Sequence, residues 1–203
     1  MKFRTLAAGV TAAAALSLPA SAMAAPGTAQ PSLLDSLSGP AHIDGHTYSA
    51  AQMRHRYAGQ KLFFVLGSRE EARGAVAAFH TRSAAKAYLR STHRAPDTRH
   101  AHAAYNPGQT VFYQDAFLEG PSIAANNNSA LGNLADYCLS STLWWCNYSW
   151  DNQISSAKTG SDGAYLYNLP YLNASGGYVY IPPTDSVELW RYFNDVTSSV
   201  WVP

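Results

Sequence analysis

The sequence has 203 residues, a formal net charge of +1 and two cysteines. Its charge is unevenly distributed, because residues 26–109 contain ten Lys/Arg and five Asp/Glu, whereas residues 110–203 contain two and eight. This asymmetry predicts two units of opposite charge. Beyond residue 25 no apolar run approaches the roughly 20 residues of a membrane-spanning helix, so we expect no membrane span.

The N-terminus has the features of a secretory signal peptide. Lys2 and Arg4 precede an apolar run over residues 6–18, and Ala22-Met23-Ala24 provides a cleavage site of the A-x-A type. Residues 1–25 are therefore predicted to be removed, and the mature protein is predicted to be secreted and extracellular. About 178 residues remain, enough for one large or two small domains.

The first half is predicted to contain a flexible segment over residues 26–40, rich in Pro, Gly, Ser and Ala, and then a small α+β domain over residues 41–91. A domain of this size is close to the lower limit for independent folding. The sequence leaves open whether it is retained or trimmed as a pro-segment. The expected elements are a helix opening at residues 47–49, a strand over 62–66, a loop over 67–71, a strand over 75–79, and a helix over 82–91 with Thr81 as its N-cap.

Residues 92–109 have scattered His and Arg, two prolines and few large apolar residues, and are predicted to be a linker. His93, His100 and His102 do not have the spacing of a standard metal site, so they are interpreted as solvated. The basic residues of the first half lack interleaved aromatic residues and a recognised module, so we expect no nucleic-acid partner.

The second half contains a repeat. Residues 150–156 read Trp-Asp-Asn-Gln-Ile-Ser-Ser, and residues 193–199 read Phe-Asn-Asp-Val-Thr-Ser-Ser, 43 positions later. Each copy ends a segment that opens with a Tyr-rich strand pattern, at residues 111–114 and 165–168. Carboxylate, amide, hydroxyl and carbonyl oxygens on a short loop are ligands of calcium, although the same residues are also common in turns.

This pattern resembles the calcium-binding signature of the βγ-crystallin fold, Asp/Asn-Asp/Asn-x-x-Ser/Thr-Ser, which occurs once per Greek-key motif. The resemblance covers about the last 95 residues. It is to the bacterial secreted type of this fold, which has a branch of metalloprotease inhibitors. It implies an all-β fold, a two-motif Greek-key sandwich over residues 110–203 behind the small α+β domain. The family's aromatic hairpin corner is only partly matched, by Tyr113, Leu118 and Gly120 in one repeat and by Tyr167 and Leu172 in the other.

The resemblance further implies two calcium sites, each shared between the repeats. Ser155 with the Gln153 carbonyl would form one site, and Ser198 with the Val196 carbonyl the other. Each site would also receive two ligands from the other repeat: the side chain in the second position of its signature and a backbone carbonyl of its first strand. The residues in the first position of each signature would brace the loops. The crossing side chains are Asn152 and Asp195, the crossing carbonyls are those of Gln114 and Asn168, and the bracing residues are Asp151 and Asn194.

The first repeat is eleven residues longer than the second between first strand and signature, and both cysteines lie in this interval. Cys138 and Cys146 are predicted to form a disulfide, as expected for an exported chain with an even cysteine count. Trp144 and Trp145 lie inside this loop, where they either cover the core or form a binding anchor. Near the signatures, the core is predicted to include Trp150, Trp190, Phe193 and Trp201.

No recognised catalytic motif is present, so the predicted function is non-enzymatic. We expect an exported, monomeric calcium-binding protein with a structural or binding role. The alternatives are an inhibitor of a secreted protease, since a disulfide-bounded loop is preorganised for binding, and a toxin-like secreted module. The partner would be a secreted protease or a cell-surface component.

Overall fold

The computed structural model describes residues 32–92, 107–142 and 145–203. The predicted signal peptide, most of the predicted linker with His93, His100 and His102, and Trp144 lie outside these residues. In the described part of the chain, no helix is long and apolar enough to cross a membrane.

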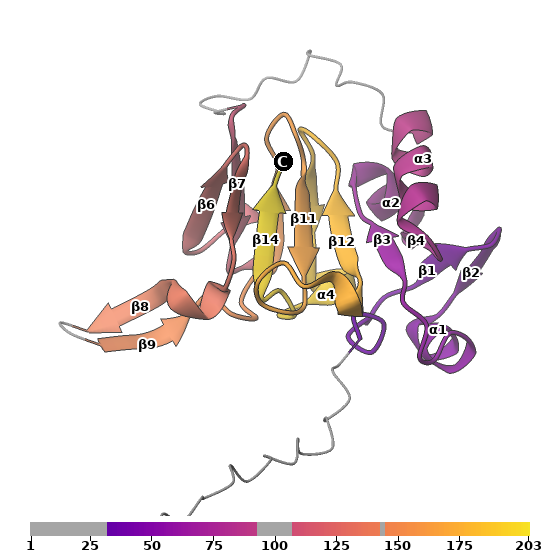
Figure 1. The fold of residues 1–203 in the computed structure, drawn as a ribbon, viewed down its shortest axis with the longest axis horizontal. Helices are drawn as coiled ribbons and strands as arrows, with labels where there is room; N and C mark the ends of the chain where they lie inside the picture. The colour runs from indigo at the N-terminus through magenta and orange to yellow at the C-terminus, as the bar shows by residue number, and fades with distance from the viewer. Residues whose placement is uncertain (1–31, 93–106, 143–144) are drawn as a thin grey trace, which may run out of the picture.

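The first half folds as two hairpin-like strand pairs with three helices (Figure 1). The capping box of Ser49 and Gln52 starts α1, so residues 47 and 48, which were expected to open the helix, instead belong to β2. Thr81 caps α3 as predicted, because its Oγ1 accepts a hydrogen bond from Ala84 N at 3.1 Å. The elements are β1 (Ala41–Ile43), β2 (His46–Tyr48), α1 (Ala50–Arg56), β3 (Phe63–Val65), α2 (Ser68–Arg73), β4 (Val76–Phe79) and α3 (Arg82–Thr92).

The helix α2 replaces the loop that was predicted over residues 67–71. Its ends are well defined, because acidic Glu70 and Glu71 lie in the first turn and Gly74 closes it in the left-handed conformation. Contacts with the second half complete it: Ser68 N donates to Asp185 Oδ2 at 3.0 Å, and Glu71 Oε1 accepts from Glu188 N at 2.6 Å. A helix this short depends on such tertiary contacts, which local sequence does not reveal.

The second half contains two sets of four strands separated by short turns. The first repeat contributes β5 (Gln109–Tyr113), β6 (Ser122–Asn126), β7 (Ser129–Leu131) and β10 (Ser156–Lys158), and the second β11 (Ala164–Tyr167), β12 (Tyr178–Ile181), β13 (Ser186–Glu188) and β14 (Ser199–Val202). Between them lie the 3-10 turns Ala116–Leu118, Leu134–Asp136 and Ala174–Gly176, the short helix α4 (Trp190–Phe193), and the inserted hairpin of β8 (Cys138–Thr142) and β9 (Trp145–Ser149).

The repeats exchange one strand each. One sheet has the order β13-β10-β5-β6, so that β13 of the second repeat pairs with β10 of the first. In the other sheet β7 of the first repeat pairs with β14 of the second. This reciprocal exchange makes residues 109–203 a two-motif Greek-key sandwich of the βγ-crystallin type, as predicted.

Both repeats form the same corner between their first two strands. Residues Phe117 and Leu118 have φ values of 61° and 60°, and Tyr171 and Leu172 have values of 59° and 55°. The last serine of each signature holds this strained turn. Ser156 Oγ accepts from Leu118 N at 3.1 Å and donates to Asp115 O at 2.6 Å. Ser199 Oγ makes the equivalent contacts with Leu172 N at 3.1 Å and Leu169 O at 2.6 Å.

The two halves share one sheet and one core. Strand β3 pairs in parallel with β12, which gives an eight-stranded sheet of order β2-β1-β4-β3-β12-β11-β14-β7 (Figure 1). Phe64 from the first half is fully buried, and its ring lies 5.0 Å from that of Phe193 in the second. The end of the segment that was predicted to be flexible is also anchored, because Leu33, Leu34 and Leu37 are buried in this core.

The predicted disulfide is present: Cys138 and Cys146 are bonded, with their Cα atoms 5.5 Å apart. It joins the strands of the β8–β9 hairpin, which projects from the sandwich (Figure 1). Trp150 and Phe193 are buried as predicted, whereas Trp190, also expected in the core, is 40% exposed. Trp190 begins the four-residue α4, whose inward face is taken by Tyr192 and Phe193.

Candidate metal centre

The two signature loops, residues 151–156 and 194–199, each contain one residue in the left-handed conformation. These are Asn152 and Asp195, both in the second signature position, with φ values of 56° and 51°. Asn and Asp adopt this conformation more readily than other residues with a Cβ atom. The recurrence of Asp/Asn at this position therefore has a backbone reason, independent of any ligand.

Side-chain oxygens from both repeats meet at Ser155. Its hydroxyl lies 3.0 Å from Asn194 Oδ1 and 3.4 Å from Asp195 Oδ1. Asn194 is oriented by its own amide, because Nδ2 donates to Asp195 Oδ2 at 2.7 Å. Ser155 itself is buried, and its backbone N–H is fixed by Tyr113 O at 3.0 Å. The loop thus gathers a hydroxyl, an amide and a carboxylate oxygen, which suits a hard cation.

The second loop has the equivalent backbone anchor, since Ser198 is buried and its N–H donates to Tyr167 O at 2.8 Å. Asn152 N donates to Thr197 O at 2.9 Å and so ties the first loop to the second. Asp151 is the counterpart of Asn194 in the repeat. Its Oδ2 accepts from Asn152 Nδ2 at 3.2 Å, but its Oδ1 is buried and has no hydrogen-bond partner among the residues that the structure describes.

A buried carboxylate oxygen without a donor costs free energy unless a cation or water satisfies it. The Asp195 carboxyl shows a related effect, because burial raises its pKa above the usual value, opposed by the hydrogen bonds from Ser155 and Asn194. Although part of Asp195 remains exposed, its negative charge is disfavoured in this position. A bound cation would stabilise both carboxylates.

The remaining residues of the predicted sites lie at or beside the loops. Gln114 Nε2 is 3.5 Å from Gln153 Oε1, which places it next to the signature of its own repeat. Asn168 directly follows β11, and Val196 packs against the main core. Across the described ranges no group of three or more His, Cys, Asp or Glu could hold a metal. An ion at the loops would depend on amide, hydroxyl and carbonyl oxygens as well as carboxylates.

Two features of the site were missed by sequence reasoning. Asn194 was expected only to brace its loop, yet its amide oxygen contacts Ser155 of the other repeat. Ser156 and Ser199 were given no role, although they hold the corners. The repetition of a second serine in both signatures was the available signal.

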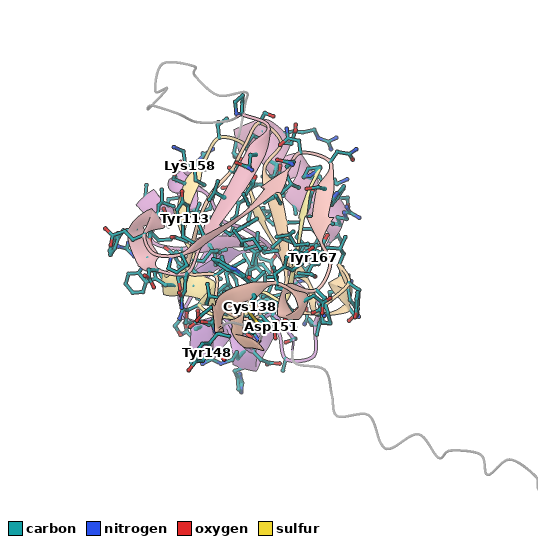
Figure 2. All side chains as sticks on the ribbon, turned by 90° about the vertical axis from the view of Figure 1, so that its left-hand side faces the viewer. Tyr113, Cys138, Tyr148, Asp151, Lys158 and Tyr167 are labelled. Atoms are coloured by element: carbon teal, nitrogen blue, oxygen red, sulfur yellow. A yellow bond between two sulfur atoms is a disulfide. The ribbon has the colours of Figure 1, made fainter. Side chains whose placement is uncertain are left out.

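The hairpin was the other predicted binding element. Trp145 belongs to β9, but its side chain, like all of Trp144, is outside the described part of the structure. Tyr148 on the same strand is 68% exposed and is labelled in Figure 2, which views the molecule from the hairpin side. Asp151 of the signature follows directly after this strand and Trp150.

Comparison with known proteins gives structural similarities only, since no protein-family model and no curated protein matches the chain. One similar solved structure is described as "Evolution of the eye lens beta-gamma-crystallin domain fold". The two chains are 20% identical, the matched region spans 49% of this chain and 90% of the other, and the TM-score is 0.36. A beta gamma crystallin from Ciona intestinalis is 15% identical, covers 47% and 100%, and has a TM-score of 0.36.

Hahellin, a beta-gamma crystallin whose structure was determined by NMR, is 22% identical, covers 46% of this chain and 88% of its own, and has a TM-score of 0.32. The strand exchange and the repeated corner, rather than these similarities, define the fold of residues 109–203.

Proposed function

We propose that the protein is an exported, non-enzymatic calcium-binding protein, in which two ions join the signature loops and stabilise a binding or structural module. The observation that carries this proposal is the meeting of Ser155 with Asn194 and Asp195 of the other repeat. The donor set fits calcium, which prefers several oxygen ligands of mixed type. The partnerless Asp151 Oδ1 in the other loop supports it further.

Each site would draw on both repeats. The first would use Ser155 Oγ, the Gln153 carbonyl and the Asp195 carboxylate, with Asn194 beside them. The second would use Ser198 Oγ, the Val196 carbonyl, Asn152 and Asp151. Carbonyls of Gln114 and Asn168 would complete the shells. Each ion would supply positive charge beside one carboxylate and would be held by groups from both loops, so that binding links the repeats.

The test is thermal unfolding of the full chain with calcium and with chelator. With a single carboxylate per site we expect dissociation constants of about 10⁻⁴ M, the order of extracellular modules. At 100 times that concentration, each site stabilises the folded state by about 2.7 kcal/mol. For a chain of this size this corresponds to a rise in Tm of about 5–11 °C per site.

Two variants at the proposed sites and one control variant distinguish loss of a ligand from loss of a negative charge. Asp195→Asn should remove much of the calcium-induced rise in Tm, and Asn152→Ala a smaller part. Glu119→Gln removes one exposed negative charge from the corner of the first repeat and should leave the rise unchanged. A rise below about one degree in the parent, where one site at saturation predicts several, would mean that the signatures are only turns.

A second candidate is inhibition of a secreted protease, favoured by the disulfide-bonded hairpin. It projects from the body of the molecule, and Tyr148 on it is 68% exposed (Figures 1 and 2). A covalently closed hairpin loses little conformational freedom on binding, which favours affinity. Titration of the protein against secreted metalloproteases and serine proteases tests this function, and loss of inhibition in Tyr148→Ala would assign it to the hairpin.

A further inference from the structure

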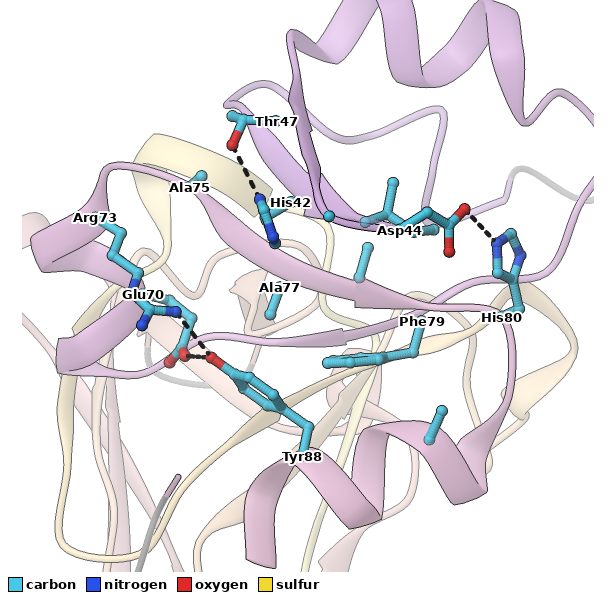
Figure 3. Close-up of a pocket in the computed structure, with 14 residues that line it drawn as sticks. His42, Asp44, Thr47, Glu70, Arg73, Ala75, Ala77, Phe79, His80 and Tyr88 are labelled. Atoms are coloured by element: carbon cyan, nitrogen blue, oxygen red, sulfur yellow. Dashed lines mark hydrogen bonds and ion pairs between the residues drawn. The ribbon is translucent and has the colours of Figure 1, made fainter. Parts of the chain in front are cut away.

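The first half contains a cavity of about 700 Å³ that no part of the calcium proposal uses. Its lining comes from the β1–β2 hairpin, α2, β4 and α3 (Figure 3). Three alanines of the segment leading into and along β4, at positions 75, 77 and 78, line it, and their short side chains leave the space open. The volume is within the range of small-ligand sites.

A carboxylate lies at the end of the cavity where β4 finishes. Asp44 Oδ2 receives hydrogen bonds from His80 Nε2 at 3.0 Å and from Tyr57 Oη at 3.2 Å. Its Oδ1 makes no hydrogen bond within the described part of the chain and remains an available acceptor. The hydrogen bond from His80 is the main cause that holds the pKa of Asp44 below its usual value, so the group stays negatively charged at neutral pH.

A guanidinium lies at the end where β4 begins. Arg73 contacts the protein through one long hydrogen bond, from Nη1 to Tyr88 Oη at 3.5 Å, and within the described residues it forms no ion pair with a carboxylate. Tyr88 is itself held by Glu70, to whose Oε1 it donates at 2.6 Å. The remaining N–H groups of Arg73 are therefore available to an anionic ligand, for which the planar guanidinium is well suited.

A further polar group lies between the two ends. His42 Nδ1 is 3.1 Å from Thr47 Oγ1, which leaves Nε2 as a second hydrogen-bonding position. Figure 3 shows the His42 ring between Arg73 and Asp44, above Ala77. The cavity thus combines an apolar floor with a central polar group and opposite charges at its ends.

The length of β4 sets the separation of the ends. From residue 75 to residue 80 an extended chain rises roughly 16 Å, at about 3.3 Å per residue, and the long Arg73 side chain shortens this gap toward the middle. A zwitterion that spans it must be longer than a free amino acid. We propose that this cavity binds a short extended peptide of about three residues, at the same rise per residue, with its terminal carboxylate at Arg73 and its amino group at Asp44.

The opposite charges make the test specific. Binding of trialanine to the full chain is measured by calorimetry, together with N-acetyl-trialanine, which lacks the ammonium, and trialanine amide, which lacks the carboxylate. Because the side chain of Asp44 is 56% exposed and Arg73 is also exposed, each ion pair would be screened by water to roughly 0.2–1 kcal/mol, so each blocked peptide should bind up to about fivefold more weakly.

The variants should act on one end each. Asp44→Asn should abolish the preference for a free amino group and keep the preference for a free carboxylate, and Arg73→Gln should do the reverse. Asn tolerates the left-handed φ of 53° at position 44, so the turn is preserved. Arg69→Gln, on the exposed side of the same helix, serves as the charge control and should change neither preference.

Two results would overturn the proposal. One is the absence of saturable binding of trialanine up to about 10 mM, a concentration that would fill even a millimolar site. The other is binding that is insensitive to blocking of both termini, or that Arg69→Gln weakens as much as Arg73→Gln. The calcium proposal does not depend on either result, because the cavity and the signature loops share no residue.

Discussion

Phe64 offers a direct test of whether the halves unfold together. Its side chain is fully buried and packs against Phe193 across the β3–β12 junction. Truncation of a buried Phe to Ala typically lowers the free energy of unfolding by about 3–5 kcal/mol. With a urea dependence near 2 kcal/mol/M, this corresponds to a decrease of roughly 1.5–2.5 M in the unfolding midpoint.

The assay exploits the distribution of tryptophan, because all five lie in residues 110–203. Urea unfolding followed by tryptophan fluorescence therefore reports on the second half, whereas the substitution lies in the first. If the sheet and core are shared, Phe64→Ala should shift the fluorescence transition by the full amount. Tyr148→Ala is the matched control, since Tyr148 is 68% exposed and outside the strained corners, and such surface changes stay within about 0.5 kcal/mol.

An unchanged fluorescence midpoint in Phe64→Ala, with the first half unfolded by circular dichroism, would show two independent domains. The reasoning from the shared sheet would then be refuted.

Three further predictions concern the second half. Denatured, unreduced protein should contain no titratable thiol, and Cys138→Ser with Cys146→Ser should lower the free energy of unfolding by about 2–3 kcal/mol; a reactive thiol in the parent would contradict this. If the protein inhibits a protease, Trp144→Ala or Trp145→Ala should weaken inhibition by about 2 kcal/mol or more, and unchanged inhibition in both would place the contact elsewhere. The calcium-induced rise in Tm should diminish as pH falls from neutral, because protons compete with the ion for Asp195. Burial raises the pKa of Asp195 in the ion-free folded state. Protonation of Asp195 therefore stabilises the ion-free folded state at low pH, and this stabilisation is lost as pH rises through the raised pKa. The part of the calcium-induced rise that Asp195→Asn removes should accordingly shrink as pH falls toward this raised pKa, and a difference between parent and Asp195→Asn that stays constant down to pH 3.8 would exclude Asp195 as a ligand.

The sequence predicts those features whose causes are local. Examples are the apolar runs that form β3 and β4, the Thr81 cap and the paired signatures. Each depends on residues close together in the chain, and each lies in the structure near its predicted position. The two-motif Greek-key sandwich followed from the resemblance, whereas the exchange of β7 and β13 between the repeats was not predicted.

Features that depend on distant partners were not predictable. Helix α2 is completed by Asp185 and Glu188, and nothing near residues 68–73 indicates those partners. Trp190 is exposed because Tyr192 and Phe193 occupy the inward positions of its short helix, which residue type alone does not decide. The cavity is assembled from four elements, so Asp44 and Arg73 have no recognisable spacing in the chain.

The junction between β3 and β12 has a consequence for the time course of folding. Phe64 is registered with Val179, 115 positions later in the chain. Loop closure over such a distance is slow, and proteins rich in distant pairings fold slowly. A chain that emerges N-terminus first therefore exposes the open edge of β3 and the side chain of Phe64 until β12 has emerged. For the exported protein proposed above, this delay would keep the first half unfolded and translocation-competent, and would make it the part most in need of a chaperone.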